Sequence, residues 1–453
     1  MNPTAVRVAS LALALAATAC SKNSPTEAPG PSAVATTTGA TVAASSASAP
    51  ASASASPSAS AATSGPPKDA NVILLSIDSL RADMPWAGYA RPIAPRLTEV
   101  EKRAVSYTRA YSTSSYTSMS LGGMLAGRIP SELNRSGYFF STYKDDPFFA
   151  KLLQADKVHT MGVHAHAYFE HAGWDAGFDQ WEIVKGIKFD NTTDRSITSP
   201  QSEEISERLL GDAALDSTRF FFWAHFLDPH DLYQSHEGIG PYGKTDRDKY
   251  DAEVTFTDQY VGKLLDFIAT KSWAKRTVII LTADHGEAFG EHGMTRHGFE
   301  VWEPLVHVPL FVLAPGATPR HIDTPRSALD LAPTIFDFLG VAPDPGFEGK
   351  SDKAEIYGAS AEPRDVWVDL PMTSDNDFRR ALIRGTDKLI CFHNDDMCKL
   401  FDLAADPGED HPITTGAKFT TMLAAYKANE ATLKPIAPYG CKAGCLNKAY
   451  MNK

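Results

Sequence analysis

The fold of this chain is decided by the stretch Val278-Ile-Ile-Leu-Thr-Ala-Asp284-His285-Gly286-Glu287, where an apolar run ends in an acid and a histidine. A second stretch, Val72-Ile-Leu-Leu-Ser-Ile-Asp78, has the same form. Short, nearly continuous apolar runs are typical of strands that are buried on both faces of a sheet. We therefore expect an α/β fold, with strands at Asn71–Ile77, Val158–Val163, Arg219–Phe226, Thr277–Ala283 and Val308–Leu313.

Helical patterns alternate with these runs, which predicts a largely parallel sheet with helices on both faces. They cover Ala94–Ala104, Met119–Leu125, Pro147–Gln154, Ser202–Leu210, Lys249–Ala269, Leu329–Leu339 and Thr415–Leu433. The C-terminal part instead shows short runs that predict a small antiparallel sheet, at Asp365–Asp369, Arg380–Arg384, Lys388–His393 and Lys399–Leu403, with a turn at 394–396. We expect a main domain at 68–345 and a C-terminal subdomain at 346–453 that completes it.

The N-terminal segment has the pattern of a signal peptide followed by a linker. Residues 1–20 combine Arg7, a short apolar run and small residues before Cys20, which resembles a lipoprotein signal peptide whose cleavage leaves Cys20 lipidated. An ordinary secretory signal with an incidental cysteine is the alternative. Residues 21–67 are almost all Ala, Ser, Thr, Pro and Gly, which predicts a disordered linker. We expect an exported, lipid-anchored protein of the bacterial cell envelope, and Ser21 after the cysteine favours the outer membrane.

Charge and cysteine content narrow the possible partners. A formal net charge of −12 argues against a nucleic-acid partner, and we expect a monomer. In an oxidising compartment, Cys391–Cys398 and Cys441–Cys445 are plausible local disulfides. A zinc site built from these four cysteines is the alternative, although their spacing fits it poorly.

A third stretch carries the chemistry. Thr117-Ser-Met-Ser-Leu-Gly-Gly-Met-Leu-Ala-Gly-Arg-Ile-Pro130 reads as a loop that runs into a helix ending at Gly127. With the strands that end in Asp78 and in Asp284–His285, it resembles the metal-and-nucleophile framework of the sulfatase branch of the alkaline phosphatase superfamily. The resemblance covers about residues 70 to 410, and further pieces in the family's order are His225-Phe-Leu-Asp-Pro-His230, His297-Gly298, Asp330-Leu-Ala-Pro-Thr334 and Leu400-Phe-Asp-Leu403.

The resemblance implies an alkaline-phosphatase-like three-layer α/β/α sandwich, with 68–345 as its catalytic domain. It also implies one divalent cation held by Asp78, Thr117, Asp284 and His285. The imidazole favours Mn²⁺ or Zn²⁺, with Ca²⁺ possible. A two-metal site is the alternative, and it would need a further cluster such as Asp228, His230 and His297.

Thr117 stands where sulfatases proper have a Cys or Ser that is oxidised to formylglycine. Threonine cannot form that aldehyde, so we expect no formylglycine. The resemblance instead implies that Thr117 is a cation-activated nucleophile, which forms a covalent ester with the substrate. The alternative is that Thr117 is a helix N-cap whose side chain bonds the backbone near Ser120.

Several other residues match family positions on the substrate side. The resemblance implies catalytic roles for His230 and His297, and anion contacts for His164, His166 and Arg81. Arg81 pairing with Asp83, and His225 hydrogen-bonding inside the sheet, remain alternatives. We expect Asp228 to form a turn before Pro229, and His292 and His307 to be structural.

Three functions are compatible with these residues. The first is a metal-dependent hydrolase that cleaves sulfate, phosphate or phosphonate esters of a small molecule, glycan or lipid through Thr117. The second is a transferase of the phosphoethanolamine or phosphoglycerol type that acts on envelope components. The third is a binding lipoprotein that keeps the fold without the chemistry.

Overall fold

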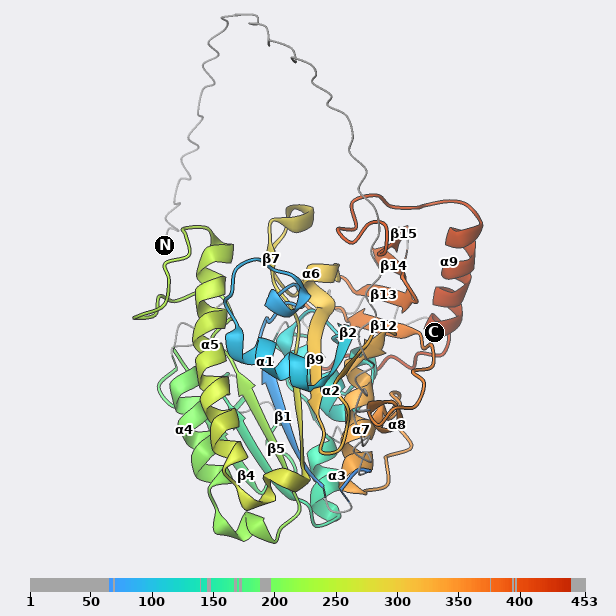
Figure 1. The fold of residues 1–453 in the computed structure, drawn as a ribbon. Coiled ribbons are helices and arrows are strands. Elements are labelled where there is room, and N and C mark those ends of the chain that lie inside the picture. The colour runs from blue at the N-terminus through green and yellow to red at the C-terminus, as the bar shows by residue number, and fades with distance from the viewer. Residues whose placement is uncertain are drawn as a thin grey trace, which may run out of the picture. The chain divides into compact units, whose positions relative to one another are not determined.

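The structure of the protein is a computed structural model. A mixed sheet forms its middle layer (Figure 1). Within the described residues its order is β10-β2-β9-β6-β1-β5-β3-β4, and β11 also pairs with β2. The strands are β1 (Asn71–Ile77), β2 (Val105–Tyr111), β3 (His159–His164), β4 (Gln180–Ile183), β5 (Phe220–Phe226), β6 (Thr277–Ala283), β9 (His307–Leu313), β10 (Arg320–Ile322) and β11 (Arg326–Ser327).

Neighbouring strands of the parallel half end at the same edge of the sheet. Strands β6, β1, β5, β3 and β4 run parallel, and Ile77 pairs with both Phe226 and Ala283. The residues that follow β1, β5 and β6 therefore leave the sheet together, as the sequence predicts. Ligands bind at such carboxyl ends in open α/β sheets.

In the other half of the sheet one strand runs against its neighbours, although the sheet as a whole is mostly parallel, as predicted. Strand β9 is antiparallel to both β6 and β2. Strand β2 was not predicted, because Ser106, Thr108 and Arg109 interrupt its apolar pattern. It is an inner strand with neighbours on both sides, and it still contributes buried residues such as Tyr107.

Helices cover both faces of the sheet, as predicted. Helices α1 (Pro95–Arg103), α4 (Ser199–Leu210) and α5 (Asp246–Ala269) pack together on one face, and α2 (Thr117–Ala126), α3 (Phe149–Ala155) and α7 (Leu331–Leu339) on the other. Their ends carry the expected signals. Thr245 and Asp248 form a capping box at the start of α5, and Gly127 ends α2 in the left-handed conformation.

Short elements connect these helices and strands. They are the single-turn helices α6 (Glu303–Val306) and α8 (Lys353–Ile356), the hairpin β7 (Ala288–Phe289) with β8 (Thr295–Arg296), and 3-10 turns at Pro85–Ala87, Pro130–Glu132, Ala213–Asp216, Ser272–Arg276, Glu291–Gly293 and Ala328–Asp330.

The C-terminal part forms the predicted antiparallel sheet, in the order β12-β13-β14-β15. Its strands are β12 (Val366–Leu370), β13 (Arg379–Arg384), β14 (Asp387–Phe392) and β15 (Met397–Asp402), and α9 (Ala417–Glu430) packs on them. A disulfide joins Cys391 to Cys398 across β14 and β15. This confirms the first predicted disulfide, and the four-cysteine zinc site is wrong.

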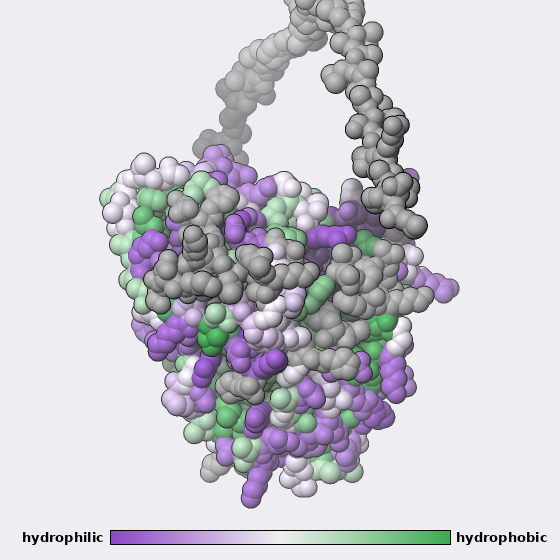
Figure 2. Space-filling view, turned by 180° about the vertical axis from the view of Figure 1, so that it is seen from behind, coloured by the Kyte–Doolittle hydropathy of each residue, from purple (hydrophilic) through white to green (hydrophobic). Residues whose placement is uncertain are grey.

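The structure describes residues 65–67, 70–138, 140–144, 148–166, 169–170, 173–187, 197–374, 376–392, 395 and 397–440. The predicted signal peptide, Cys20, nearly all of the linker and the Cys441–Cys445 pair lie outside the described residues. Among those described, no helix is long and apolar enough to cross a membrane. On the coloured part of the face in Figure 2, hydrophilic residues are interspersed with small hydrophobic areas.

Candidate active site

Five elements bring acidic, imidazole and hydroxyl groups together at the carboxyl edge of the sheet. Asp78 follows β1, and Asp284 and His285 follow β6. His166 comes two residues after β3, His225 lies within β5, and Thr117 begins α2. All of these side chains are buried. The four predicted metal ligands are thus neighbours, although they come from distant parts of the chain.

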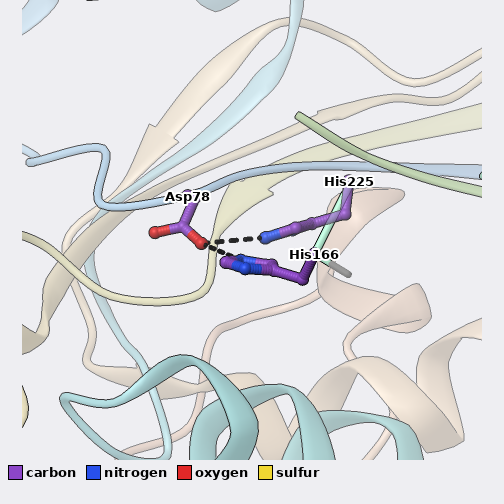
Figure 3. Close-up of side chains that lie close together, drawn as sticks. All are labelled: Asp78, His166 and His225. Carbon is purple, nitrogen blue, oxygen red and sulfur yellow. Dashed lines mark hydrogen bonds and ion pairs between the residues drawn. The ribbon is translucent and has the colours of Figure 1, made fainter. Parts of the chain in front are cut away.

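Asp78 stands at the centre of this cluster. Its Oδ2 accepts hydrogen bonds from Nε2 of His166 at 2.7 Å and Nε2 of His225 at 3.2 Å (Figure 3). Its Oδ1 accepts one from the hydroxyl of Ser79 at 2.8 Å. Burial raises the pKa of Asp78, but His230 and the two bonded imidazoles outweigh it, so the pKa lies well below its ordinary value. Asp78 is therefore ionised.

Asp284 has the opposite electrostatic character. Its Oδ1 accepts hydrogen bonds from the backbone N–H groups of Ser79 and His285, at 3.2 and 2.9 Å. Its Oδ2 is buried and has no hydrogen-bond partner among the described residues. Burial, and then the charge of Asp78, raise the pKa of Asp284 well above its ordinary value. A buried carboxylate oxygen without a partner is costly.

His285 is held in one tautomer. Its Nδ1 lies 2.9 Å from the carbonyl oxygen of Gly286, so Nδ1 carries the proton and donates it. Its Nε2 then has a lone pair, which accepts the hydroxyl hydrogen of Thr117 at 2.9 Å. Nε2 is also 3.3 Å from Oδ2 of Asp284. Burial lowers the pKa of His285, which keeps the ring neutral.

The start of α2 fixes Thr117. The N-cap residue is Tyr116, and the hydroxyl of Thr117 bonds to His285 rather than to the backbone of the helix. The N-cap alternative for Thr117 is therefore wrong. Ser120, one turn on, donates to the carbonyl oxygen of Asp284 at 2.5 Å and ties the helix to β6. A helix N-terminus next to the hydroxyl of Thr117 would favour an anionic group there.

The donor atoms fit a divalent cation. Ligand atoms of Asp78, Asp284 and His285 lie within 4.8 Å of one another, and those of Asp78, His166 and His225 form a second such group. The unpaired Oδ2 of Asp284 and the lone pair on His285 are donors of the kind that a cation needs. Carboxylate and imidazole ligands suit Mn²⁺ and Zn²⁺.

Two further histidines approach the cluster. The ring of His297 lies 4.2 Å from that of His285 and 5.0 Å from that of His230, centroid to centroid. Nδ1 of His297 is 3.1 Å from Oε1 of Glu287, and the hydroxyl of Tyr233 donates to Oε2 of the same carboxylate at 3.1 Å. Burial lowers the pKa of His297, but the carboxylates of Glu287, Asp78 and Asp231 together outweigh burial and raise it overall. The structure thus brings both predicted catalytic histidines to the site.

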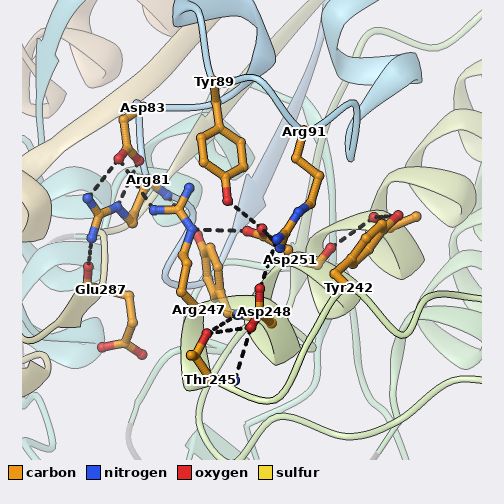
Figure 4. Close-up of polar contacts among 12 residues, drawn as sticks. Arg81, Asp83, Tyr89, Arg91, Tyr242, Thr245, Arg247, Asp248, Asp251 and Glu287 are labelled. Carbon is orange, nitrogen blue, oxygen red and sulfur yellow. Dashed lines mark hydrogen bonds and ion pairs between the residues drawn. The ribbon is translucent and has the colours of Figure 1, made fainter. Parts of the chain in front are cut away.

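Arg81 is committed to other partners. Its guanidinium donates to both carboxylate oxygens of Asp83 at 2.7 Å and to the carbonyl oxygen of Glu287 (Figure 4). It also donates to Oε1 of Glu291. Arg81 thus pairs with Asp83, which was the predicted alternative to a contact with the substrate. Arg81 therefore holds the segment after β1 against the one after β6.

The remaining residues divide between structural positions and the edge of the cluster. Asp228 accepts from the backbone N–H groups of Thr198 and Ser199 at the start of α4, so it is not a second metal ligand. His164 is buried against the ring of His225 at 4.9 Å, outside both donor groups. As expected, His292 and His307 pack on aromatic rings, those of Trp302 and Tyr111.

The sequence left the role of His225 open and gave no role to Glu287. His225 contacts Asp78 as well as Ser76 inside the sheet, and Glu287 orients His297. The register of β1 and β5 pairs Ser76 with His225, one residue before the strands end. A histidine near the end of an otherwise apolar strand, beside a strand that ends in an acid, is the sequence pattern that could have indicated a role for His225 at the site.

Comparison with known proteins gives a consistent picture. The family model described as Sulfatase matches residues 70–341 of the 453. Choline-sulfatase of Rhizobium meliloti is 29% identical over 193 residues, which cover 40% of this chain and 37% of the relative. N-acetylglucosamine-6-O-sulfatase of Bacteroides thetaiotaomicron is 30% identical over 182 residues, 38% of this chain and 32% of the relative. The chain thus matches about a third of the length of these relatives.

Solved structures share the fold over a larger part of the chain. Phosphonate monoester hydrolase of Agrobacterium radiobacter superposes with a TM-score of 0.68 at 16% identity, over 80% of this chain and 95% of that one. BT4656, solved in complex with its substrate D-glucosamine-2-N,6-O-disulfate, gives 0.67 at 18% identity, over 80% and 98%. At such identities the likeness shows the alkaline-phosphatase-like fold alone.

Proposed function

This chain belongs to the sulfatase family, and we propose that it is a metal-dependent hydrolase of anionic esters whose nucleophile is Thr117. The ester is a sulfate, phosphate or phosphonate. Phosphorus esters suit the site better, because a threonine side chain cannot become the aldehyde on which sulfatases proper depend. Two observations support this range of substrates. The relatives include proteins named as sulfatases, and the fold is shared with a phosphonate monoester hydrolase.

One observation carries the proposal. The hydroxyl of Thr117 lies 2.9 Å from Nε2 of His285, in the same buried cluster as the carboxylates of Asp78 and Asp284. An alcohol is a weak nucleophile at neutral pH unless its proton is removed. A divalent cation held by Asp78, Asp284, His285 and Thr117 would lower the pKa of the hydroxyl and neutralise charge on the ester oxygens.

Residues around Thr117 would bind the anionic ester and protonate the leaving oxygen. The N-terminus of α2 favours a negatively charged ester at Thr117. Once its proton has passed to solvent water, Oγ1 attacks, which forms the bond from Thr117 to phosphorus or sulfur and breaks the bond to the leaving oxygen. His297, whose pKa Glu287 raises, is placed to donate a proton to that oxygen. Water then cleaves the Thr117 ester and regenerates the hydroxyl.

The test compares Thr117→Ala and Thr117→Ser with wild type, on p-nitrophenyl sulfate, p-nitrophenyl phosphate, bis-p-nitrophenyl phosphate and phenylphosphonate esters in the presence of Mn²⁺ or Zn²⁺. We expect Thr117→Ala to lose turnover by at least about 10³-fold, and Thr117→Ser to retain most of it. Thr98→Ala is the matched control, because its hydroxyl only bonds Ala94 within α1. Undiminished turnover in Thr117→Ala would refute the nucleophile.

The same assay separates hydrolysis from transfer. Adding glycerol or ethanolamine diverts a covalent Thr117 ester to the alcohol in a transferase, whereas a hydrolase keeps releasing inorganic phosphate or sulfate. Wild-type protein that binds cation but turns over no ester, with or without an acceptor alcohol, would favour the binding lipoprotein.

A further inference from the structure

Asp78 presents its two carboxylate oxygens to two different sets of neighbours. Oδ2 faces the imidazoles of His166 and His225, at 2.7 and 3.2 Å. Oδ1 points away from both rings (Figure 3) and lies 3.8 Å from Nε2 of His285. The cation of the proposed function would use the oxygen of Asp78 that faces Asp284 and His285. The other side is a second donor group that this cation does not use.

The second group has the composition of a zinc site. It offers one carboxylate oxygen and two imidazole nitrogens, all within 4.8 Å of one another and all buried. Two histidines and one carboxylate, with a position left open, are a common set of protein ligands for catalytic Zn²⁺. Buried donors of this kind are rarely placed together without strong compensation.

The outer contacts of His225 allow its ring to act as a ligand. Oγ of Ser76 lies 2.8 Å from Nδ1 of His225 and accepts the indole N–H of Trp223 at 2.9 Å. A hydroxyl oxygen accepts two hydrogen bonds, so Ser76 can also accept Nδ1–H of His225. In that tautomer Nε2 carries a lone pair toward Asp78. Metal-bound histidines generally have such a partner on the second ring nitrogen.

We propose that Asp78, His166 and His225 hold a second divalent cation, of the Zn²⁺ class, and that Asp78 bridges it to the first. The inference deepens the proposed function, on which it rests, by adding an ion next to the reacting ester. Binding would shift the proton of each imidazole, His166 and His225, from Nε2 to Nδ1, so that both Nε2 lone pairs face the cation.

A second ion also narrows the substrate class. The carboxylates of Asp78 and Asp284 carry two negative charges between them, whereas two divalent cations carry four positive charges. The resulting excess favours a dianionic ester over a monoanionic one, because Coulomb attraction grows with charge in a buried site. The geometry thus points to phosphate monoesters rather than sulfate esters or phosphodiesters.

The first test counts metal ions bound to the full-length chain after Zn²⁺ loading and dialysis, by mass spectrometry of the metal. We expect two equivalents in wild type and one in His225→Gln. Glutamine can still donate a hydrogen bond to Asp78 but is a poor zinc ligand. His321→Gln is the control, because His321 is an exposed imidazole that pairs with Glu101 and should leave two equivalents.

Each other outcome has a definite meaning. One equivalent in wild type overturns the second site and leaves the proposed function standing. Zero equivalents overturns both. Two equivalents in both wild type and His225→Gln overturns the assignment of His225 as a ligand, and with it the proposal.

The second test does not depend on whether His225→Gln folds. Anomalous scattering at the zinc edge from crystals of the wild-type protein should show two peaks about 3.5–4 Å apart, the spacing of two-metal sites. One of them should lie between Asp78, His166 and His225. A single peak beside Asp284 and His285 would overturn the proposal.

Discussion

Asp284 bears much of the electrostatic cost of the site when no cation is bound. Its Oδ2 has no hydrogen-bond partner among the described residues, and its pKa is raised. A carboxyl group whose folded pKa exceeds its unfolded pKa contributes stability only below the unfolded value, near 3.9, and loses it as the pH rises through the folded pKa. The contribution of Asp284 to the stability of the metal-free protein should therefore fall as the pH rises from about 4.

We expect Asp284→Asn to remove this loss. In EDTA at pH 8 the variant should be more stable than wild type by about 1–3 kcal/mol, the cost of an unsatisfied buried polar group. It should lose the rise in melting temperature that Mn²⁺ or Zn²⁺ gives the wild type. Thermal unfolding with and without metal measures both effects. A variant that is less stable than wild type in EDTA would contradict the electrostatic account.

At the scale of single residues, the sequence was informative where motifs carry the chemistry. Asp78, Thr117, Asp284 and His285 come together as predicted, because each directly follows a strand or begins a helix. The role of His225 stayed open, because its contact with Asp78 depends on which strand lies beside β1. That neighbour is decided by the whole sheet, which no local pattern encodes.

At the scale of elements, the antiparallel direction of β9 could not be predicted from the sequence. The run at β9 is apolar throughout, and a strand buried on both faces has this pattern whether it runs parallel or antiparallel. Helices were predicted more closely, since α1, α4, α5 and α7 have clear start and stop signals and differ from their predicted ranges by only a few residues.

Helix α5 offers a test of pH-dependent stability. Glu253 is buried on it, accepts from the backbone N–H of Gln234, and lies 2.5 Å from Nε2 of His236. Burial, and then the charge of Asp228, raise the pKa of Glu253 to about 10. Its folded pKa exceeds its unfolded value, so its contribution to stability is complete below about 4.5 and is lost as the pH rises toward 10.

Glu253→Gln should remove this dependence. Glutamine is neutral at every pH and can still accept from Gln234 and donate to His236. The variant should gain stability relative to wild type as the pH rises from 6 to 9, as measured by chemical unfolding at each pH. Glu99→Gln, at an exposed carboxylate, controls for the loss of a titrating group. Parallel pH profiles for wild type and Glu253→Gln would disprove the prediction.

The disulfide between β14 and β15 should stabilise the C-terminal sheet. Cys391 and Cys398 are 7 residues apart, so the loop-entropy relation gives about 2–3 kcal/mol for closing this short loop in the unfolded chain. We expect the double change Cys391→Ala and Cys398→Ala to lower the free energy of unfolding by this amount. Denaturant unfolding measures it. The single changes should cost no less than the double one, because each leaves a free thiol in a packed position.

At the scale of the whole molecule, the sequence predicts an anchor for the catalytic domain. We propose that the protein is exported and held at the bacterial envelope by a lipid on Cys20. Cys20→Ser should release it from the membrane fraction into the soluble envelope fraction, without changing turnover by the catalytic domain. Fractionation followed by immunodetection tests this. A membrane-bound Cys20→Ser protein would exclude the lipid anchor.

The division into domains stays a prediction from composition and pattern. The change from Ala- and Ser-rich sequence to alternating apolar runs predicts a boundary at 68, and β1 starts three residues later, at Asn71. The C-terminal sheet was predicted because its strands are short and separated by turn residues, unlike the long apolar runs before them.

Trp223 gives this buried site an optical reporter. Its indole N–H is bonded to Ser76, whose hydroxyl bonds His225, so the chromophore is three hydrogen bonds from Asp78. A cation that reverses the bond between Ser76 and His225 should shift the indole's emission, and the shift should saturate with the second equivalent of zinc. Trp223→Phe should bind the metal silently. Fluorescence would then follow occupancy of the inner site in real time, without substrate and without a label.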